Sequence, residues 1–358
     1  MKSVPGLYVE GTKLLERPES RRTVFADGTS ESGFREGTDV ELSHWIPNRT
    51  PPRFKADTST EICMNFVAAT HTDYDLVVNN HADVDGILSV FTLLHPATAL
   101  AHRSTIVAAA GMGDFWGWGD TESQVLFQSL TKYVDALTGA GADPQFIYER
   151  CLKHVDGVIG RGFSDPDIEK SLAPLKRSVD LIVQGMVKRR EYHDRFVHYE
   201  LPADLCKDNI EAALRVPTFN AAISDEVLFW PQARARWDRE KVQLTSVESA
   251  NGWYYDLWYP SYLWAETPDS WRAPGLDLRG DSNGYKLSFA PLTAAVRDLQ
   301  ARERNDVAWR TEPVFSLLSP AVMRGYPVVL SVMRGDTAAP SSLSPDVVAG
   351  RLAEAFSI

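Results

Sequence analysis

The chain has 358 residues, of which 44% are hydrophobic and 24% are charged, and its formal net charge is -11. This length and composition predict one large or two ordinary globular domains. The negative charge argues against binding to long nucleic acids, which requires a basic surface, but it permits a small anionic substrate that is met locally by a metal ion or by a few arginines.

The three cysteines are isolated in the sequence and form no C-x-x-C pair: Cys63, Cys151 and Cys206. They predict neither a disulfide framework nor a thiolate zinc site. The first residues contain no apolar signal region, and no apolar run approaches the roughly 20 residues that span a membrane. We therefore expect a cytoplasmic protein that does not interact with membranes. The sequence does not indicate its oligomeric state.

Composition and patterning suggest three regions. Residues 1–60 are rich in Pro, Gly, Ser, Thr and charge, which predicts a strap over the surface of a domain. Residues 61–200 predict an α/β domain with a parallel sheet, and residues 201–358 a smaller α+β domain that covers or binds the substrate. Within the strap, His44 and Arg49 lie in the stretch 42–51, together with prolines that stiffen the backbone. They belong either to an ordered, capped loop or to a strap that brings one of them to a site.

The expected elements of the second region begin with a helix that starts near residues 57–61. The apolar residues 76–78 predict an interior strand of a parallel sheet. Apolar residues at positions 87, 90, 91 and 94 share one helical face, and Pro96 ends that helix. A second apolar run at 105–110 predicts the next strand, so residues 76–110 are interpreted as a βαβ unit.

Further helices are expected at residues 121–139, 144–155 and 174–193. The last of these carries His193, which is either a hydrogen-bonded core histidine or a group that reaches a site. The part after residue 201 is expected to be mainly β, with hairpins at Asn251-Gly252 and Asn283-Gly284. A strand at 326–332 and helices that begin at residues 291 and 344 complete the expected elements.

Metal-binding side chains follow the strand at 76–78, namely His81, Asp83 and Asp85 at alternate positions. Alternate residues of an extended segment point the same way, so these three side chains can converge on one ion. Imidazole with carboxylate suits Mn²⁺, Zn²⁺ or Fe, and carboxylate with water suits Mg²⁺ or Mn²⁺. The alternative is a polar turn whose acids cap the next helix.

A second acidic position lies in the glycine- and tryptophan-rich stretch 111–120. Asp114 would follow the second predicted strand, and ligands gather at the carboxyl ends of parallel strands. We therefore expect Asp114 to join the metal site, while a turn around buried tryptophans is the alternative. No phosphate-binding P-loop motif occurs in the sequence.

The nine residues from His81 to Ser89, HADVDGILS, resemble the first motif of the DHH phosphoesterase superfamily, H-x-D-x-D-G-x-x-S. The preceding strand and the following helix also match. The resemblance implies an Mn²⁺-dependent phosphoesterase in which His81, Asp83 and Asp85 are metal ligands and Asp114 holds the position of the second motif. The Asp-His-His triplet of the superfamily is absent, the nearest fragment being EYHD at residues 191–194. The chain as a whole resembles an uncharacterised bacterial family.

We therefore expect a metal-dependent hydrolase with Mn²⁺ (or Mg²⁺, Zn²⁺ or Fe), most simply a phosphoesterase acting on a small phosphorylated metabolite or nucleotide. The candidate catalytic residues are Asp85, His44, His193 and Arg49, with a histidine as general acid or outer ligand and the arginine holding the anion. One alternative is a degenerate DHH-like protein that only binds a ligand or a partner. Another is a metal-dependent hydrolase of a C–N or C–O bond.

A further alternative comes from the four residues from Asp83 to Gly86, DVDG, which resemble the nucleophile motif D-x-D-G-T of haloacid-dehalogenase-type phosphatases. In that case Asp83 would be the covalent nucleophile and Asp85 the acid/base. The usual threonine of that motif is Ile87 here.

Overall fold

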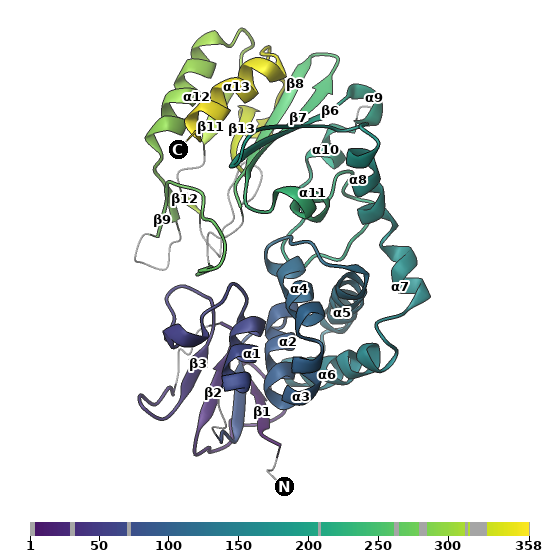
Figure 1. Cartoon of the computed structure of the whole chain (residues 1–358), viewed down its shortest axis with the longest axis vertical. Helices are drawn as coiled ribbons and strands as arrows, with labels where there is room; N and C mark the ends of the chain where they lie inside the picture. The colour runs from purple at the N-terminus through teal and green to yellow at the C-terminus, as the bar shows by residue number, and fades with distance from the viewer. Residues whose placement is uncertain are drawn as a thin grey trace. The chain divides into compact units, whose positions relative to one another are not determined.

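The computed structural model describes residues 4–28, 33–69, 73–206, 209–260, 265–278, 285–311, 314–315 and 328–357. The chain forms two compact units, which are coloured by residue number in Figure 1. The first unit contains Met1–Leu172 and two later segments, Thr218–Ile223 and Ala265–Ser270. The remaining residues form the second unit, so the boundary expected near residue 200 falls inside it.

The first unit is built on a four-stranded parallel sheet with the order β1-β4-β2-β3. Its strands are β1 (Gly6–Val9), β2 (Thr23–Ala26), β3 (Val40–Leu42) and β4 (Leu76–Asn79). The predicted mixed α/β class with a parallel sheet is confirmed, as is the interior strand at 76–78. Residues 1–60 supply three of the four strands, which the expected strap did not include. These strands have only three or four residues, too few for a clear periodicity.

Helices of the first unit pack against this sheet and against one another (Figure 1). The helices that contact the strands are α1 (Ser59–Ala69), α2 (Val84–Leu94) and α6 (Pro144–Gly160). The other helical elements are η1 (Pro52–Phe54), α3 (Pro96–Ala101), α4 (Arg103–Asp114), α5 (Thr121–Gly139) and α7 (Pro166–Ser171). The helix predicted after residue 86, ending before Pro96, is confirmed as α2.

The apolar run at 105–110 forms a helix instead of the predicted strand. It lies inside α4, so the expected βαβ unit over residues 76–110 is wrong. The run ends in three consecutive alanines, which have the highest helix propensity, and α4 packs against α2 and α5. Asp114 is therefore the last residue of a helix and does not follow a strand.

The helix predicted at 174–193 is shorter than expected. It is α8 (Ala173–Val183), and it is followed by Gly185 in the left-handed region with φ of +71°. The Gly185 N–H donates to the Ile182 carbonyl at 3.1 Å, which is a common glycine-terminated helix end. His193 consequently ends a strand, β5 (Lys188–His193).

The second unit is built on a mixed sheet with the order β11-β13-β8-β7-β6-β5 and with β14 paired to β13. Strands β6 and β7 are parallel and the other neighbours are antiparallel. The strands after β5 are β6 (Phe196–Leu201), β7 (Val242–Ser249), β8 (Gly252–Trp258), β11 (Ala308–Thr311), β13 (Val328–Arg334) and β14 (Thr337–Ala338). The hairpin predicted at Asn251-Gly252 is confirmed as the β7–β8 pair.

The remaining strands form a small antiparallel sheet: β9 (Leu276–Leu278), β10 (Tyr285–Leu287) and β12 (Val314–Phe315). The turn predicted at Asn283-Gly284 between β9 and β10 lies outside the described residues, as do the first two residues of the strand predicted at 326–332. The helices of this unit, besides α8, are α9 (Ala203–Cys206), α10 (Ile210–Leu214), α11 (Pro231–Asp238), α12 (Ala290–Arg302) and α13 (Pro345–Ala355).

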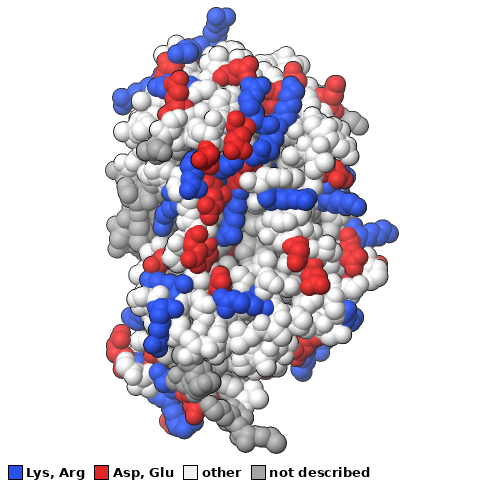
Figure 2. All heavy atoms as spheres, viewed as in Figure 1, with Lys and Arg blue, Asp and Glu red and all other residues white. Residues whose placement is uncertain are grey.

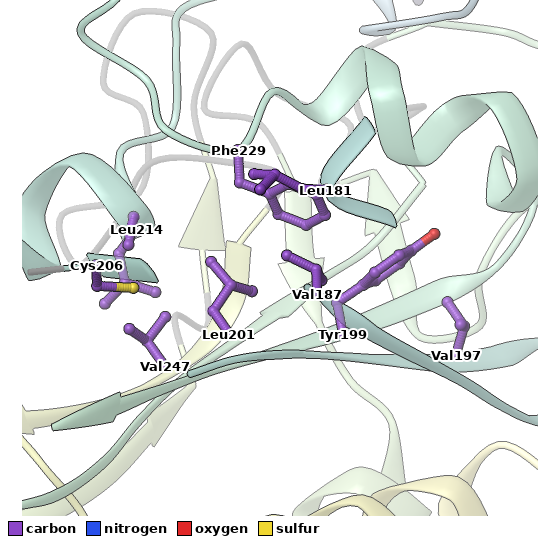
Figure 3. Packing of buried hydrophobic residues seen from close by; sticks show 10 residues of the cluster. Leu181, Val187, Val197, Tyr199, Leu201, Cys206, Leu214, Phe229 and Val247 are labelled. Atoms are coloured by element: carbon purple, nitrogen blue, oxygen red, sulfur yellow. The ribbon is translucent and has the colours of Figure 1, made fainter. Parts of the chain in front are cut away.

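A hydrophobic core lies between one face of the mixed sheet and helices that include α8, α9 and α10 (Figure 3). Its buried members include Tyr199 and Val247 from the sheet, Leu181 from α8 and Cys206 from α9. All three cysteines are buried and free, in agreement with the sequence.

Two surface properties follow from the described residues. Lys and Arg side chains are interspersed with Asp and Glu over the face shown in Figure 2, so neither sign dominates it. Among the residues that the structure describes, no helix has the length and apolar character needed to cross a membrane.

Candidate metal centre

Six acidic and histidine side chains, of types that can bind a metal ion, gather in the first unit, close to the carboxyl-terminal ends of its strands. Asp27 directly follows β2, His44 lies two residues after β3, and Asp114 ends α4. The other three members come from the loop after β4 and the first turn of α2: His81, Asp83 and Asp85. The carboxyl ends of parallel strands are the usual place for a ligand in an α/β sheet.

The two histidines divide this cluster into two overlapping groups. The Nε2 atom of His44 lies 3.6 Å from the nearest carboxylate oxygen of each of three acids: Asp27, Asp85 and Asp114. The Nε2 atom of His81 lies 3.0 Å from Asp27 Oδ2 and 3.3 Å from Asp83 Oδ2. Asp27 thus belongs to both groups and presents a different oxygen to each histidine.

The other ring nitrogen of each histidine fixes its tautomer. His44 Nδ1 lies 2.6 Å from the Asp57 carbonyl oxygen, which can only accept a hydrogen bond, so the proton is on Nδ1. His81 Nδ1 lies 2.8 Å from the amide oxygen of Asn80, which also can only accept, so the proton of this ring is likewise on Nδ1. In the neutral ring, Nε2 then carries a lone pair that faces carboxylate oxygens. Such an arrangement of acceptors is stable only when a cation, either a proton or a metal ion, lies between them.

The distances suit ligands of a shared ion. Asp27 Oδ2 and His81 Nε2 are both buried and lie 3.0 Å apart, and a proton or a metal ion between them would satisfy both. Ligand atoms about 2.1 Å from one ion lie about 3.0 Å apart at a right angle and about 3.4 Å apart at the tetrahedral angle. Two sets of residues meet the spacing required of ligands: Asp27, His81 and Asp83, and Asp27, His44 and Asp85.

Burial and mutual repulsion shift the pKa values of the acids. Burial and the negative charge of Asp27 raise the pKa of Asp85 to about 6. Burial and the charges of Asp85, Asp83 and Asp27 raise the pKa of Asp114 well above its usual range. Without a metal ion, the cluster therefore retains protons that a divalent cation would displace.

In the group around His81, attraction between opposite charges outweighs the effect of burial on the pKa values. Burial would raise the pKa of Asp27, but the charges of His81 and His44 and a hydrogen bond from Ser59 lower it to about 2. Burial would lower the pKa of His81, but the charges of Asp83 and Asp27 raise it well above 6.5. A cation at this position is thus strongly favoured, and in the absence of a metal it is the imidazolium proton.

The N-terminus of α1 holds the acids in place. The backbone N–H groups of Ser59 and Thr60 each donate to one oxygen of Asp85 at 2.8 Å. The Ser59 hydroxyl donates to Asp27 Oδ1 at 2.8 Å and accepts from the His44 N–H at 3.1 Å. One serine therefore fixes members of the cluster that come from β2, β3 and α2.

The acids also have the structural roles that the sequence left open. Asp83 caps α2, since its Oδ1 accepts from the Gly86 N–H at 2.8 Å, while its Oδ2 faces His81. Asp85 satisfies two N–H groups of α1, and each of its oxygens retains a further lone pair. Capping and metal binding are therefore compatible for both residues.

Two glycines allow the loops to approach one another. The turn after β2 has Asp27 and Gly28 in the left-handed region, with φ of +55° and +73°. A Cβ on Gly28 would lie 2.3 Å from Asn80 Oδ1, and a Cβ on Gly86 would lie 2.9 Å from Tyr148 Oη. A larger residue at position 28 would push the turn of Asp27 away from the loop of His81, and one at position 86 would push the start of α2 away from Tyr148 of α6.

The segment Ala265–Ser270 holds the loop that carries His44. The Glu266 N–H donates to the His44 carbonyl at 2.7 Å, and Lys55 Nζ lies 2.6 Å from the Glu266 carboxylate. The Asp269 N–H donates to Asp57 Oδ1 at 2.9 Å, and the Ser270 hydroxyl donates to the other oxygen of Asp57. The Asp57 carbonyl in turn accepts from the His44 ring, so a late segment of the chain supports the position of His44.

The cluster is reached from the side of His81 and Asp83. Their side chains are 26% and 17% exposed, whereas the other four are at most 1% exposed. The indole ring of Trp45 lies 5.2 Å from the His81 ring, measured between centroids. An entering molecule would therefore meet His81, Asp83 and Trp45 first.

Five of the predicted site residues are thus brought together: His44, His81, Asp83, Asp85 and Asp114. The other two are held elsewhere. Arg49 contacts Glu36 and Glu41 and its guanidinium lies over the Phe34 ring. His193 belongs to the second unit, where Nε2 lies 3.0 Å from the Ala353 carbonyl and Nδ1 accepts from the Arg195 N–H.

The glycine-rich stretch 111–120 is a close-packed turn. A Cβ on Gly117 would lie 2.8 Å from the Gly111 carbonyl oxygen, and Trp116 is buried. Asp120 caps α5 by accepting from the Ser123 N–H. The stretch therefore contributes Asp114 to the cluster and packs closely around the buried Trp116.

Sequence reasoning missed Asp27 and Asn220. Asp27-Gly28 directly follows a short apolar run, and this signal could have revealed it. Asn220 donates to Asp114 Oδ1 at 3.0 Å, yet it comes from a distant segment without a motif. No local pattern could have placed it.

Fold and site together define an α/β protein with a carboxylate- and imidazole-rich candidate metal centre at the ends of parallel strands. The chain is similar to a family of unknown function (DUF6687), whose model matches residues 14–152, less than half of the chain. The matched part contains all six side chains of the cluster. Comparison with curated proteins and with solved structures found no match.

Proposed function

We propose that this protein is a metal-dependent hydrolase that acts on a phosphate ester or anhydride of a small molecule. The observation that carries the proposal is that two histidines with fixed tautomers direct Nε2 at carboxylates, and that Asp27 is shared between them. The resemblance of residues 81–89 to the first DHH motif supports the phosphoesterase reaction. Mixed nitrogen and oxygen ligands favour Mn²⁺, with Zn²⁺, Fe and Mg²⁺ as alternatives.

The residues of the cluster would hold up to two ions. Asp27, His81 and Asp83 would bind one, and His44, Asp85 and Asp114 would bind another together with the second oxygen of Asp27. Bound divalent ions lower the pKa of water and neutralise the charge of phosphoryl oxygens. The partly exposed side chains of His81 and Asp83 mark the side on which the substrate would bind.

The remaining residues of the site position these groups. Asn80 and the Asp57 carbonyl keep the two imidazoles in the tautomer that a metal requires. Ser59 orients Asp27, and the N-terminus of α1 stabilises the negative charge of Asp85. Trp45 would contact the non-reacting part of a substrate bound beside His81.

Metal analysis of the full chain, purified without chelators, tests the first part of the proposal. We expect a bound divalent metal in the wild-type protein and its loss in Asp27→Asn, because Asp27 serves both groups. Asp39→Asn is the matched control, since Asp39 is also a buried acid after β2 but pairs with Arg35 outside the cluster. A wild-type protein that takes up none of Mn²⁺, Mg²⁺, Zn²⁺ and Fe²⁺ would refute it.

The reaction is tested separately with a substrate panel in the presence of Mn²⁺. We expect turnover of phosphomonoesters, phosphodiesters or pyrophosphate that is lost in Asp27→Asn and retained in Asp39→Asn. A metal-loaded protein that cleaves only amide or ester substrates would instead favour a hydrolase of C–N or C–O bonds. A metal-loaded protein without any turnover would favour a binding protein, in which Asp83 and Asp85 act as helix caps beside the ion.

A further inference from the structure

Asn220 lies in Thr218–Ile223, which belongs to the first unit although α10 and α11 on either side of it in the sequence belong to the second. We propose that Asn220 is a positioning residue of the metal centre, an inference that rests on the proposed metal-dependent function. The side chain does not need to bind the ion. It fixes two of the carboxylates that would.

Both polar atoms of the Asn220 side chain, and its backbone N–H, are directed at the segments that carry the site. Its Nδ2 donates to Asp114 Oδ1 at 3.0 Å and lies 3.4 Å from Asp83 Oδ2. Its Oδ1 accepts from the Val84 N–H at 3.2 Å, in the first turn of α2. Its backbone N–H donates to the Gly113 carbonyl at 2.9 Å. One residue thereby joins the end of α4 to the start of α2.

The hydrogen bond to Asp114 decides which oxygen that residue presents. Because Oδ1 is occupied by Asn220, Oδ2 is the atom that faces His44 at 3.6 Å. An amide is suited to this task, since it donates hydrogen bonds without carrying a charge. A lysine or arginine at the same place would neutralise the carboxylates and compete with a divalent ion.

The surroundings of Asn220 are shaped to accept it. Its φ of +57° lies in the left-handed region, which asparagine adopts more readily than most residues. A Cβ on Gly113 would lie 2.2 Å from Asn220 Oδ1, so a glycine is needed opposite the amide. The buried side chain of Gln128 holds the end of the segment, accepting from the Ile223 N–H at 2.8 Å and donating to its carbonyl at 3.0 Å.

The test uses two independent ways of removing the amide. Asn220→Gly deletes the side chain and tolerates the positive φ, whereas Gly113→Ala leaves Asn220 in place and forces its amide aside. Ala221→Gly is the control for a more flexible segment. Mn²⁺ affinity of the full chain is measured by calorimetry, with thermal unfolding recorded for each variant.

We expect each single variant to weaken Mn²⁺ binding about 10- to 100-fold, the usual effect of losing a group that orients a metal ligand. In the double variant, Gly113→Ala should add less than about twofold to the loss caused by Asn220→Gly, because the amide it displaces is already gone. Ala221→Gly should bind within about twofold of wild type. Mn²⁺ should also slow hydrogen exchange at residues 218–223 in wild type but not in Asn220→Gly.

Two outcomes would overturn the inference alone: wild-type affinity in Asn220→Gly, or losses that simply add in the double variant. Should Asn220→Gly fail to fold, the affinity of Gly113→Ala decides, since alanine is favourable within α4. A purely structural role would lower the unfolding temperature without changing the affinity of the folded protein. If the wild-type protein bound no metal, the proposed function would fall together with this inference.

Discussion

Metal binding by this cluster should release protons and weaken steeply in mild acid. The metal-free protein holds Asp85 with a pKa of about 6, raised from 3.8 by burial and by the charge of Asp27. A ligand must lose its proton before it binds, so the affinity is divided by 1 + 10^(pKa − pH) for each such group. The pKa of Asp85 alone therefore makes binding at pH 5 about 10-fold weaker than at pH 7.

For an ordinary carboxyl group with a pKa of about 3.8, the same calculation changes the metal affinity by less than about 1.1-fold between pH 5 and 7. Calorimetry can distinguish this from the roughly 10-fold change expected for Asp85. Asp114 and His81 also have raised pKa values, so the release of their protons should steepen the dependence. Titrations with Mn²⁺ at pH 5, 6 and 7, in two buffers with different ionisation enthalpies, give both the affinity and the number of protons released.

Asp39→Asn should show the same pH dependence as the wild-type protein, because Asp39 is paired with Arg35 away from the cluster. An affinity that changes less than about twofold between pH 5 and 7, with no proton release, would refute the reasoning. It would mean that the acids are already ionised before the metal binds.

Three further predictions concern stability and ligand orientation. Because the folded pKa of Asp85 exceeds the unfolded value, the chelated protein binds more protons when folded, so its stability should fall from pH 4 to 7, by about 2 kcal/mol for this group. Urea unfolding with chelator should show this fall, excess Mn²⁺ should abolish it, and a rise would contradict it. Ser59→Ala removes the hydroxyl that donates to Asp27, which should lower the unfolding free energy by about 1–3 kcal/mol in urea titrations; an unchanged value would argue against this support. Asn80→Ala releases Nδ1 of His81 and should weaken Mn²⁺ binding about 10- to 100-fold by calorimetry, whereas unchanged affinity would show that the tautomer is fixed otherwise.

The part of the site that the sequence revealed is local. Strand β4, the ligand loop and α2 are adjacent, and each has a strong signal: a buried apolar run, alternating ligands and apolar residues on one helical face. The sequence therefore predicted that the side chains of His81, Asp83 and Asp85 lie close together. The sequence also indicated His44, through its position between polar residues and prolines.

The remainder depends on contacts between distant residues. Strands β1–β3 are too short to show a period, and they become strands by pairing with β4 and with one another. The run at 105–110 was ambiguous because Ile and Val favour strands while the following alanines favour a helix, and packing against α2 decided for the helix. Asn220 reaches Asp114 across 106 positions, which no local pattern encodes.

The first unit is built from three separate segments of the chain, which affects its folding during synthesis and the design of truncated variants. All six candidate ligands lie within the part that matches the family model, residues 14–152, and they are translated before the two segments that complete the unit. A nascent chain would expose Asp83 and Asp114 without the amide of Asn220, and Asp57 without Asp269 and Ser270, until those segments had emerged. A product trimmed to the matched residues would likewise carry every ligand and lack β1, which pairs directly with β4. The natural boundary of this unit is set by its contacts in space, and an excised N-terminal half would be an incomplete protein.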